Sequence, residues 1–143
     1  MIVRSRRVTE WARHVGVSLN ELDAVLSAWP VQSAWAFGST VRADDTATSD
    51  IDIAVVVVPY GSGPTHPPKA FRVSAGLPIE WHCWVDMPAF LRAEVAATGI
   101  AIFESRPGEA ELIAREAMTA WQRDASARAQ RRAAELANAR PLT

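Results

Sequence analysis

The chain has 143 residues, a length that predicts a single domain with a hydrophobic core of its own. Hydrophobic residues make up 49% of it and charged residues 22%, a balance that excludes a globally disordered chain. The formal net charge of −1 lacks the basic excess that marks many nucleic-acid-binding proteins.

Two helices are predicted within residues 8–29. The second begins with Ser18-Leu19-Asn20-Glu21, a capping box, and continues as an apolar stripe at helical spacing. The shorter first helix, over about residues 9–15, should end at Gly16, because glycine is the preferred residue just beyond a helix C-terminus.

Residues 33–104 are predicted to form the core. Residues 33–37 are short and apolar and indicate a buried strand that enters a tight turn at Gly38-Ser39. Residues 50–58 are rich in Val and Ile, which is typical of a strand buried on much of both faces. Residues 59–68 are the most loop-like stretch of the chain.

The rest of the chain continues the alternation of strands and helices. Residues 71–85 predict a hairpin, and Asp86 is expected to cap a helix that ends at Gly99. Residues 100–103 predict a short strand, and an Ala- and Arg-rich helix is expected over residues 109–138. The apolar side of that last helix is expected to consist of Leu112, Ile113, Met118 and Trp121. This order predicts an α/β (α+β) fold, a mixed sheet of about four to five strands with flanking helices.

Chemistry is concentrated in Gly38-Ser39 and, after a gap of ten residues, in Asp50-Ile51-Asp52. Residues i and i+2 of a strand point the same way, so Asp50 and Asp52 share one face. Adjacent carboxylates on an apolar strand repel each other and are costly to desolvate, and a divalent cation such as Mg²⁺ removes that cost. Gly38 lets the backbone approach a ligand closely. Either feature alone is more often a plain turn or a solvated acidic pair; together they indicate a metal and phosphate site.

These motifs also resemble a known family. Phe37-Gly38-Ser39, the ten-residue gap and Ser49-Asp50-Ile51-Asp52-Ile53 are similar to the signature of the DNA polymerase β-like nucleotidyltransferase superfamily. The resemblance is to its minimal nucleotidyltransferase branch in particular, which includes small antibiotic-modifying enzymes and the antitoxins of paired toxin systems. It covers residues 33–104 and ends in a strand led by Gly99 that is similar to the strand closing the family's core sheet.

The family uses a third carboxylate on a neighbouring strand, and Glu80 is the candidate. Strand alternation places Glu80 and His82 on one face. The opposite face is apolar and is expected to be the core, with Ile79, Trp81, Cys83 and Val85. Asp86 competes with Glu80 but suits a helix N-cap better. His82 is either a phosphate or acceptor contact or a half-buried strand residue, and Cys83 is interpreted as a packing residue.

The resemblance implies a site and a reaction. Mg²⁺ (or Mn²⁺) would be held by three residues that also carry catalysis, Asp50, Asp52 and Glu80. The triphosphate would be bound by Gly38, Ser39 and Arg42, although Arg42 is equally well read as a surface arginine. A nucleoside monophosphate would pass from a nucleoside triphosphate, with ATP the expected donor, to an acceptor hydroxyl on a small molecule or a partner toxin protein.

Other interpretations stay open. The same fold could serve an antitoxin that neutralises a partner toxin by binding alone, and a second copy of the chain could complete the acceptor pocket. Ala12, Gly16 and Leu22 fall at helix-turn-helix spacing, but the recognition helix would carry Glu21 and Asp23 and no Lys or Arg, so nucleic acid is not an expected partner.

The expected location is the cytoplasm, without a membrane partner. The longest apolar run, residues 53–58, is far shorter than the ~20 residues that span a bilayer. Cys83 is the only cysteine, which excludes an intramolecular disulfide and is compatible with a reducing compartment.

Overall fold

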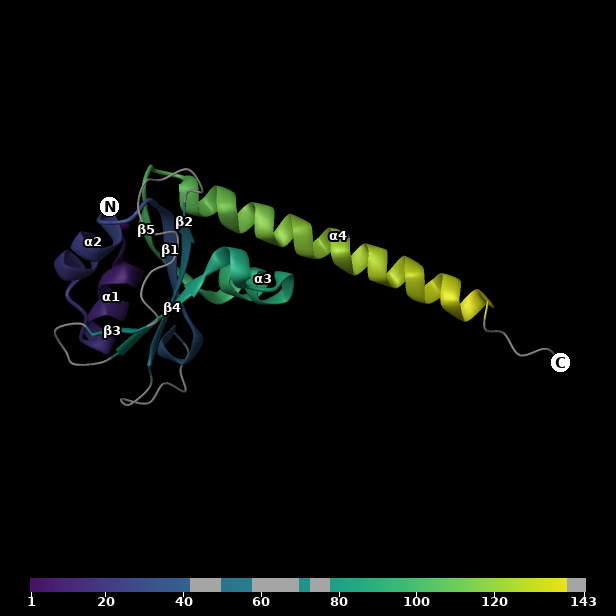
Figure 1. The fold of residues 1–143 in the computed structure, drawn as a ribbon, viewed down its shortest axis with the longest axis horizontal. Coiled ribbons are helices and arrows are strands. Elements are labelled where there is room, and N and C mark those ends of the chain that lie inside the picture. Colours follow the sequence, from purple (N-terminus) through teal and green to yellow (C-terminus); the bar gives the residue numbers. More distant parts are fainter. Residues whose placement is uncertain (42–49, 58–69, 73–77, 139–143) are drawn as a thin grey trace.

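Five strands form one mixed sheet in the computed structural model, which describes residues 1–41, 50–57, 70–72 and 78–138 (Figure 1). The strands are β1 (Val31–Phe37), β2 (Ile51–Val57), β3 (Ala70–Arg72), β4 (Pro78–Cys83) and β5 (Ile100–Glu104). Their order across the sheet is β3-β4-β2-β1-β5. β2 and β4 are parallel, and the other neighbouring pairs are antiparallel. The predicted mixed sheet with flanking helices is therefore confirmed.

One face of the sheet is covered by α1 (Arg6–Val15) and α2 (Leu19–Ser27). α2 begins as predicted, because the Ser18 hydroxyl accepts a hydrogen bond from the Glu21 amide at 3.3 Å. α1 begins three residues earlier than expected, since Ser5 caps it by accepting from the amide of Val8. Its predicted end is confirmed by Gly16, which adopts a left-handed conformation with φ 77°.

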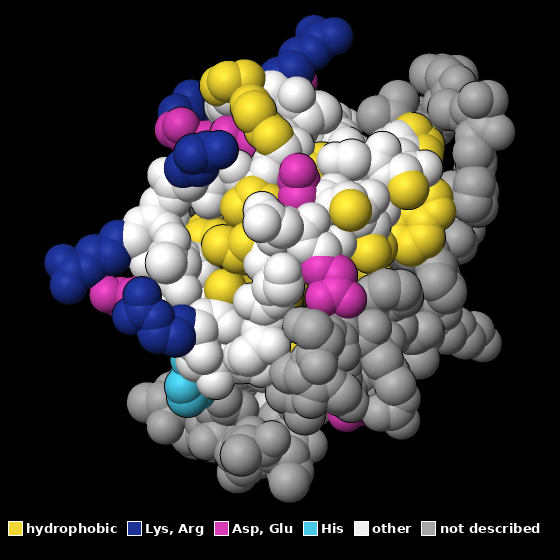
Figure 2. Space-filling view, turned by 90° about the vertical axis from the view of Figure 1, so that its left-hand side faces the viewer, with side chains coloured by type: hydrophobic (Ala, Val, Ile, Leu, Met, Phe, Trp, Pro, Cys, Tyr) yellow, Lys and Arg dark blue, Asp and Glu magenta, His cyan; other side chains and the backbone are white. Residues whose placement is uncertain are grey.

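The core beneath these helices contains the large apolar side chains of β2 and β4. Ile51, Ile53 and Ile79 are fully buried there, and Trp81 packs with them against α1 and α2. Full burial of each isoleucine contributes about 2 kcal/mol to the free energy of unfolding. Figure 2 views this side of the molecule and shows hydrophobic side chains among polar ones, with arginine side chains projecting from the upper and left-hand parts of the surface.

The opposite face is covered by α3 (Ala89–Thr98) and by the first half of α4 (Glu109–Asn138). A second hydrophobic cluster fills this layer, and its centre is a stacked pair, Trp35 on β1 and Trp84 after β4, with ring centroids 5.2 Å apart. Ala54 lies in the same cluster. Since Asp52 is two residues before Ala54, it belongs to this second face of the sheet.

α4 has the predicted length but a different packed side. Its buried residues are Ala110, Ile113 and Ala117, so Leu112 points outward and is 51% exposed. The expected apolar side was wrong at Leu112 because small alanines, spaced three and four residues from Ile113, set the contact with α3 and the sheet. Beyond Trp121 every residue as far as Asn138 is exposed, and this half of the helix projects from the body (Figure 1).

The end of β4 also differs from prediction. The strand stops at Cys83, and residues Trp84–Asp86 form a short 3₁₀ helix, η2. Alternation therefore ends there, and Val85, expected in the core, is 66% exposed. Asp86 does not cap α3, because the N-cap residue is Pro88, two positions further on.

Candidate functional site

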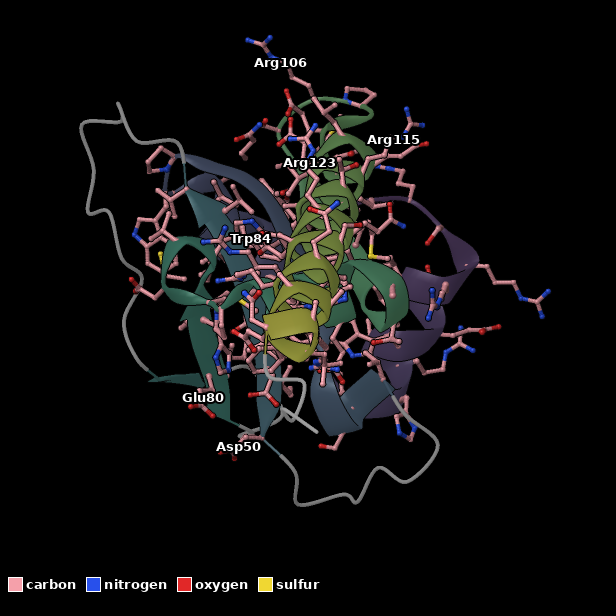
Figure 3. All side chains as sticks on the ribbon, turned by 90° about the vertical axis from the view of Figure 1, so that its right-hand side faces the viewer. Asp50, Glu80, Trp84, Arg106, Arg115 and Arg123 are labelled. Atoms are coloured by element: carbon pink, nitrogen blue, oxygen red, sulfur yellow. The ribbon has the colours of Figure 1, made fainter. Side chains whose placement is uncertain are left out.

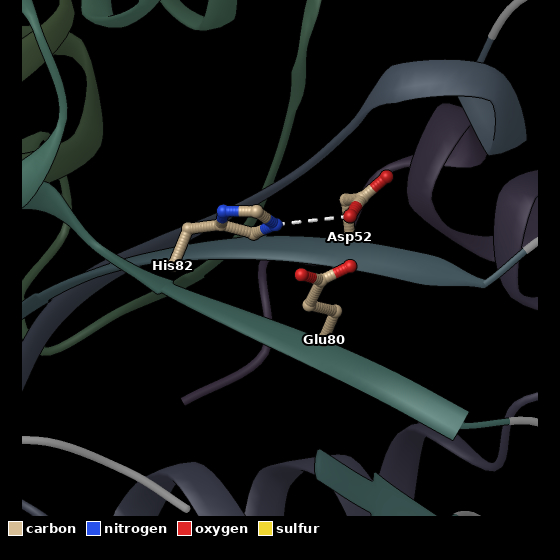
Figure 4. Close-up of side chains that lie close together, drawn as sticks. All are labelled: Asp52, Glu80 and His82. Atoms are coloured by element: carbon tan, nitrogen blue, oxygen red, sulfur yellow. Dashed lines mark hydrogen bonds and ion pairs between the residues drawn. The ribbon is translucent and has the colours of Figure 1, made fainter. Parts of the chain in front are cut away.

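Two parallel strands bring three polar side chains together. In the register between β2 and β4, Asp52 is opposite Glu80 and Ala54 is opposite His82. Glu80 and His82 thus lie on the same face as Asp52, as strand alternation predicted. One ligand atom from each of Asp52, Glu80 and His82 lies within 4.8 Å of the others (Figure 4). We call these three residues the acidic cluster.

A hydrogen bond orders the centre of the acidic cluster. Nε2 of His82 lies 2.9 Å from Oδ1 of Asp52, with the two side chains 28% and 24% exposed. The His82 ring packs edge-to-face with Phe37 on β1, with ring centroids 4.9 Å apart. The hydrogen bond to Asp52 raises the pKa of His82, the negative charges of Asp52 and Glu80 raise it further, and burial opposes them.

Gly38 leaves room for the Asp52 carboxylate. It follows β1 directly, opens the short 3₁₀ helix η1 (Gly38–Val41) and has φ +80°, a conformation that side chains disfavour. A Cβ atom at this position would lie 2.7 Å from Oδ2 of Asp52. Glycine is therefore required both for the turn and for the close approach of the Asp52 carboxylate. Ser39, the next residue, is partly buried in η1.

Asp50 and Arg42 are two predicted site residues that are not among the three residues of the acidic cluster. Asp50 is an exposed residue just before β2 and is not one of the three clustered side chains. Figure 3 shows it with Glu80 at the same end of the sheet, opposite to the end where Arg106 lies. Arg42 lies outside the described residues, as does the loop-like stretch over residues 59–68.

The acidic cluster has the donors that a divalent cation needs. Two carboxylates and one imidazole converge from neighbouring strands, and the missing side chain of Gly38 lets Oδ2 of Asp52 lie against the backbone there. A cation would offset the repulsion between Asp52 and Glu80. Cys83 has a different environment, since burial raises the pKa of its thiol and so disfavours the nucleophilic thiolate.

The sequence match agrees with this geometry. Residues 21–77 match the family model of the nucleotidyltransferase domain. This stretch of the chain is similar to a nucleotidyltransferase domain. The match contains Gly38, Ser39, Asp50 and Asp52, and with it the predicted resemblance and the predicted enzyme class are confirmed. No curated protein sequence matches the chain.

Solved structures share the fold of this chain. A toxin–antitoxin crystal structure with AMP-PNP matches with a TM-score of 0.59 and 16% identity, over 80% of this chain and 94% of that chain. A toxin–antitoxin MntA–HepT structure matches at 0.53 and 17%, over 78% and 91%. The tri-AMPylated Shewanella oneidensis HEPN toxin in complex with MNT antitoxin gives 0.53 and 16%, over 78% and 90%. These identities establish the fold alone.

The family match ends at residue 77, before β4. The placement of Glu80 and His82 beside Asp52 therefore follows from the sheet register and not from the match. His82 was weighed in the sequence as a contact but was not included among the expected metal ligands. The signal that pointed to it was its alternation with Glu80 along one strand.

In the described part of the chain, no helix combines the length and the hydrophobicity needed to cross a bilayer.

Proposed function

We propose that the chain transfers AMP from ATP to a hydroxyl group of a partner protein in a reaction that depends on Mg²⁺ or Mn²⁺. The observation that supports this most is the acidic cluster beside Gly38, inside a nucleotidyltransferase fold. In this reaction the acceptor oxygen forms a bond to the α-phosphorus, the bond from that phosphorus to the β-phosphate oxygen breaks, and pyrophosphate leaves.

The residues have separate roles in this proposal. Asp52 and Glu80 hold the metal, and Asp50 adds a carboxylate from the solvent side. A bound divalent cation would neutralise phosphate charge and make the acceptor hydroxyl easier to deprotonate. Glu80, the more exposed carboxylate of the acidic cluster, accepts the hydroxyl proton. Gly38 and Ser39 give the phosphates access to the backbone beside Asp52, and Arg42 contacts the triphosphate.

The acceptor class is inferred from the structural relatives. The matched chains belong to toxin–antitoxin complexes, and the toxin in one of them is AMPylated. A protein hydroxyl is therefore favoured over the hydroxyl of a small molecule. In this proposal residues 1–143 act as one domain in the cytoplasm, built from the N-terminal helices α1 and α2, the five-stranded sheet with α3, and the C-terminal helix α4. Neutralising a partner by binding alone is the competing function for the same fold.

The donor side is tested with ATP labelled on its α-phosphate and the purified chain. Calorimetry should show that ATP binds much more weakly without a divalent cation, because the carboxylates repel the phosphates. Asp52→Asn and Glu80→Gln should each lower transfer on the order of 10²-fold or more with the melting temperature kept. Asp86→Asn is the matched control and should keep transfer. Equal ATP affinity with and without metal would refute the metal site, and loss of transfer only in Asp86→Asn would move it to Asp86.

The acceptor side is tested with the same labelled ATP in a lysate of host cells. Label on a protein, present with the wild type and absent with Asp52→Asn, is the expected result. Label on a compound of low molecular mass would instead identify a small-molecule acceptor. Binding of metal and ATP without any transfer of label would favour the competing function.

A further inference from the structure

The acidic cluster contains a nitrogen donor in addition to its carboxylates. Nε2 of His82 is the ring atom that lies 2.9 Å from Asp52 Oδ1, and the ring contacts Phe37 at its side. β4 carries Glu80 two residues earlier on the same face. The imidazole is therefore held with a donor atom among the carboxylates, and no large rearrangement is needed for all three side chains to meet one ion.

The spacing of these atoms fits a shared ion. Adjacent ligands of an octahedral cation with bonds of about 2.1 Å lie about 3 Å apart, and opposite ligands lie about 4.2 Å apart. The Nε2 to Oδ1 distance of 2.9 Å matches the adjacent spacing, and all three ligand atoms lie within 4.8 Å of one another. The proton that Asp52 and His82 share in the metal-free protein would be replaced by the ion.

Asp50 is not one of the three clustered side chains. It is exposed before β2, whereas His82 lies within β4 and is mostly buried. Among the described residues, the third donor that clusters with Asp52 and Glu80 is thus an imidazole. Imidazole binds first-row transition metals well, whereas Mg²⁺ takes almost only oxygen ligands.

We propose that Nε2 of His82 is a direct ligand of the catalytic metal together with Asp52 and Glu80, and that the site consequently binds Mn²⁺ more tightly than Mg²⁺. This inference rests on the proposed function, because it concerns the metal of the same site. It makes His82 the residue that determines metal preference in this chain.

Pulsed electron paramagnetic resonance of Mn²⁺ bound to the full chain tests the ligand directly. A coordinated imidazole gives a ¹⁴N modulation in the echo decay, and this readout does not depend on activity. The wild type should show it, and labelling the chain with ¹⁵N-histidine should change it without any substitution. His82→Asn should abolish it, while the control variants His14→Asn and His66→Asn at the chain's other two histidines should keep it.

Calorimetric titrations with Mn²⁺ and Mg²⁺ give the second readout. The wild type should bind Mn²⁺ more tightly than Mg²⁺, and His82→Asn should lower the Mn²⁺ affinity about ten-fold or more with a smaller change for Mg²⁺. Circular dichroism melting checks that this variant folds; if it does not, the ¹⁵N-histidine experiment on the wild type still decides.

The outcomes separate the two proposals. Mn²⁺ that binds without ¹⁴N modulation in the wild type overturns the role of His82 and leaves the proposed function standing. A modulation that persists in His82→Asn also overturns the role of His82. Failure of both cations to bind, with or without ATP, refutes the proposed function and the inference with it.

Discussion

Replacement of Gly38 by alanine should damage both the fold and the metal site, in amounts that can be separated. Alanine at this position would have to keep the backbone angle φ +80°, which costs about 1–2 kcal/mol for a residue with a side chain. With an unfolding entropy of ~2.1 cal/mol/K per residue, this corresponds to a fall in melting temperature of about 3–7 °C. The methyl carbon would also lie 2.7 Å from Oδ2 of Asp52, so the carboxylate must move.

Gly108 provides the matched control. It has φ +91°, and a Cβ atom there would meet nothing within 4 Å. Gly108→Ala should therefore show a similar loss of melting temperature without any effect at the acidic cluster. The difference between the two variants isolates the collision with Asp52, which we expect to weaken Mn²⁺ binding by about ten-fold or more.

The assay is differential scanning calorimetry of both variants, followed by Mn²⁺ titration of each folded protein. The reasoning is refuted if Gly38→Ala binds Mn²⁺ as the wild type does. It is also refuted if Gly108→Ala weakens metal binding as much as Gly38→Ala, because the loss would then follow from the backbone conformation and not from contact with Asp52.

Two further predictions concern pH and the last helix. The pKa of His82 is raised, chiefly by its hydrogen bond to Asp52, so its contribution to stability should be full below the unfolded value of 6.5 and lost as pH rises through the folded pKa. Melting of metal-free wild type and His82→Gln across this pH range checks the sign of the effect. A difference in melting temperature between the two proteins that widens with rising pH would contradict the prediction. Truncation after Gln122 should change the melting temperature by less than about 2 °C, because residues 122–138 are exposed; a larger loss would show that they contribute to the fold.

The parts of the site that could be predicted from sequence are those set by strand periodicity. Asp52 and Glu80 face each other because each lies at a position of its strand whose neighbours, Ile53 and Trp81, are required in the core. That argument needs only alternation and the apolar pattern, and both hold over β2 and β4. The cap of α2 at Ser18 was predictable for a similar reason, since its signal lies within four residues.

The errors occurred where periodicity changes or where contacts come from elsewhere in the chain. Alternation was extended past Cys83, but η2 turns the backbone, so Val85 left the core and Asp86 was not a cap. Leu112 was assigned to the packed side of α4 by its hydrophobicity. The packed side instead contains Ala110, whose small side chain allows the helix to lie close to the sheet. The hydrogen bond between Asp52 and His82 joins different strands, so only the register could reveal it.

The projecting half of α4 affects how the protein moves through solution. Thirty helical residues extend about 45 Å at 1.5 Å per residue, longer than the ~37 Å diameter expected from the radius of gyration of a compact chain of this length. Such a particle tumbles anisotropically and has more hydrodynamic drag than a sphere of 15.6 kDa. Its early elution from a sizing column would imitate a dimer, so the number of copies must be measured by light scattering or native mass.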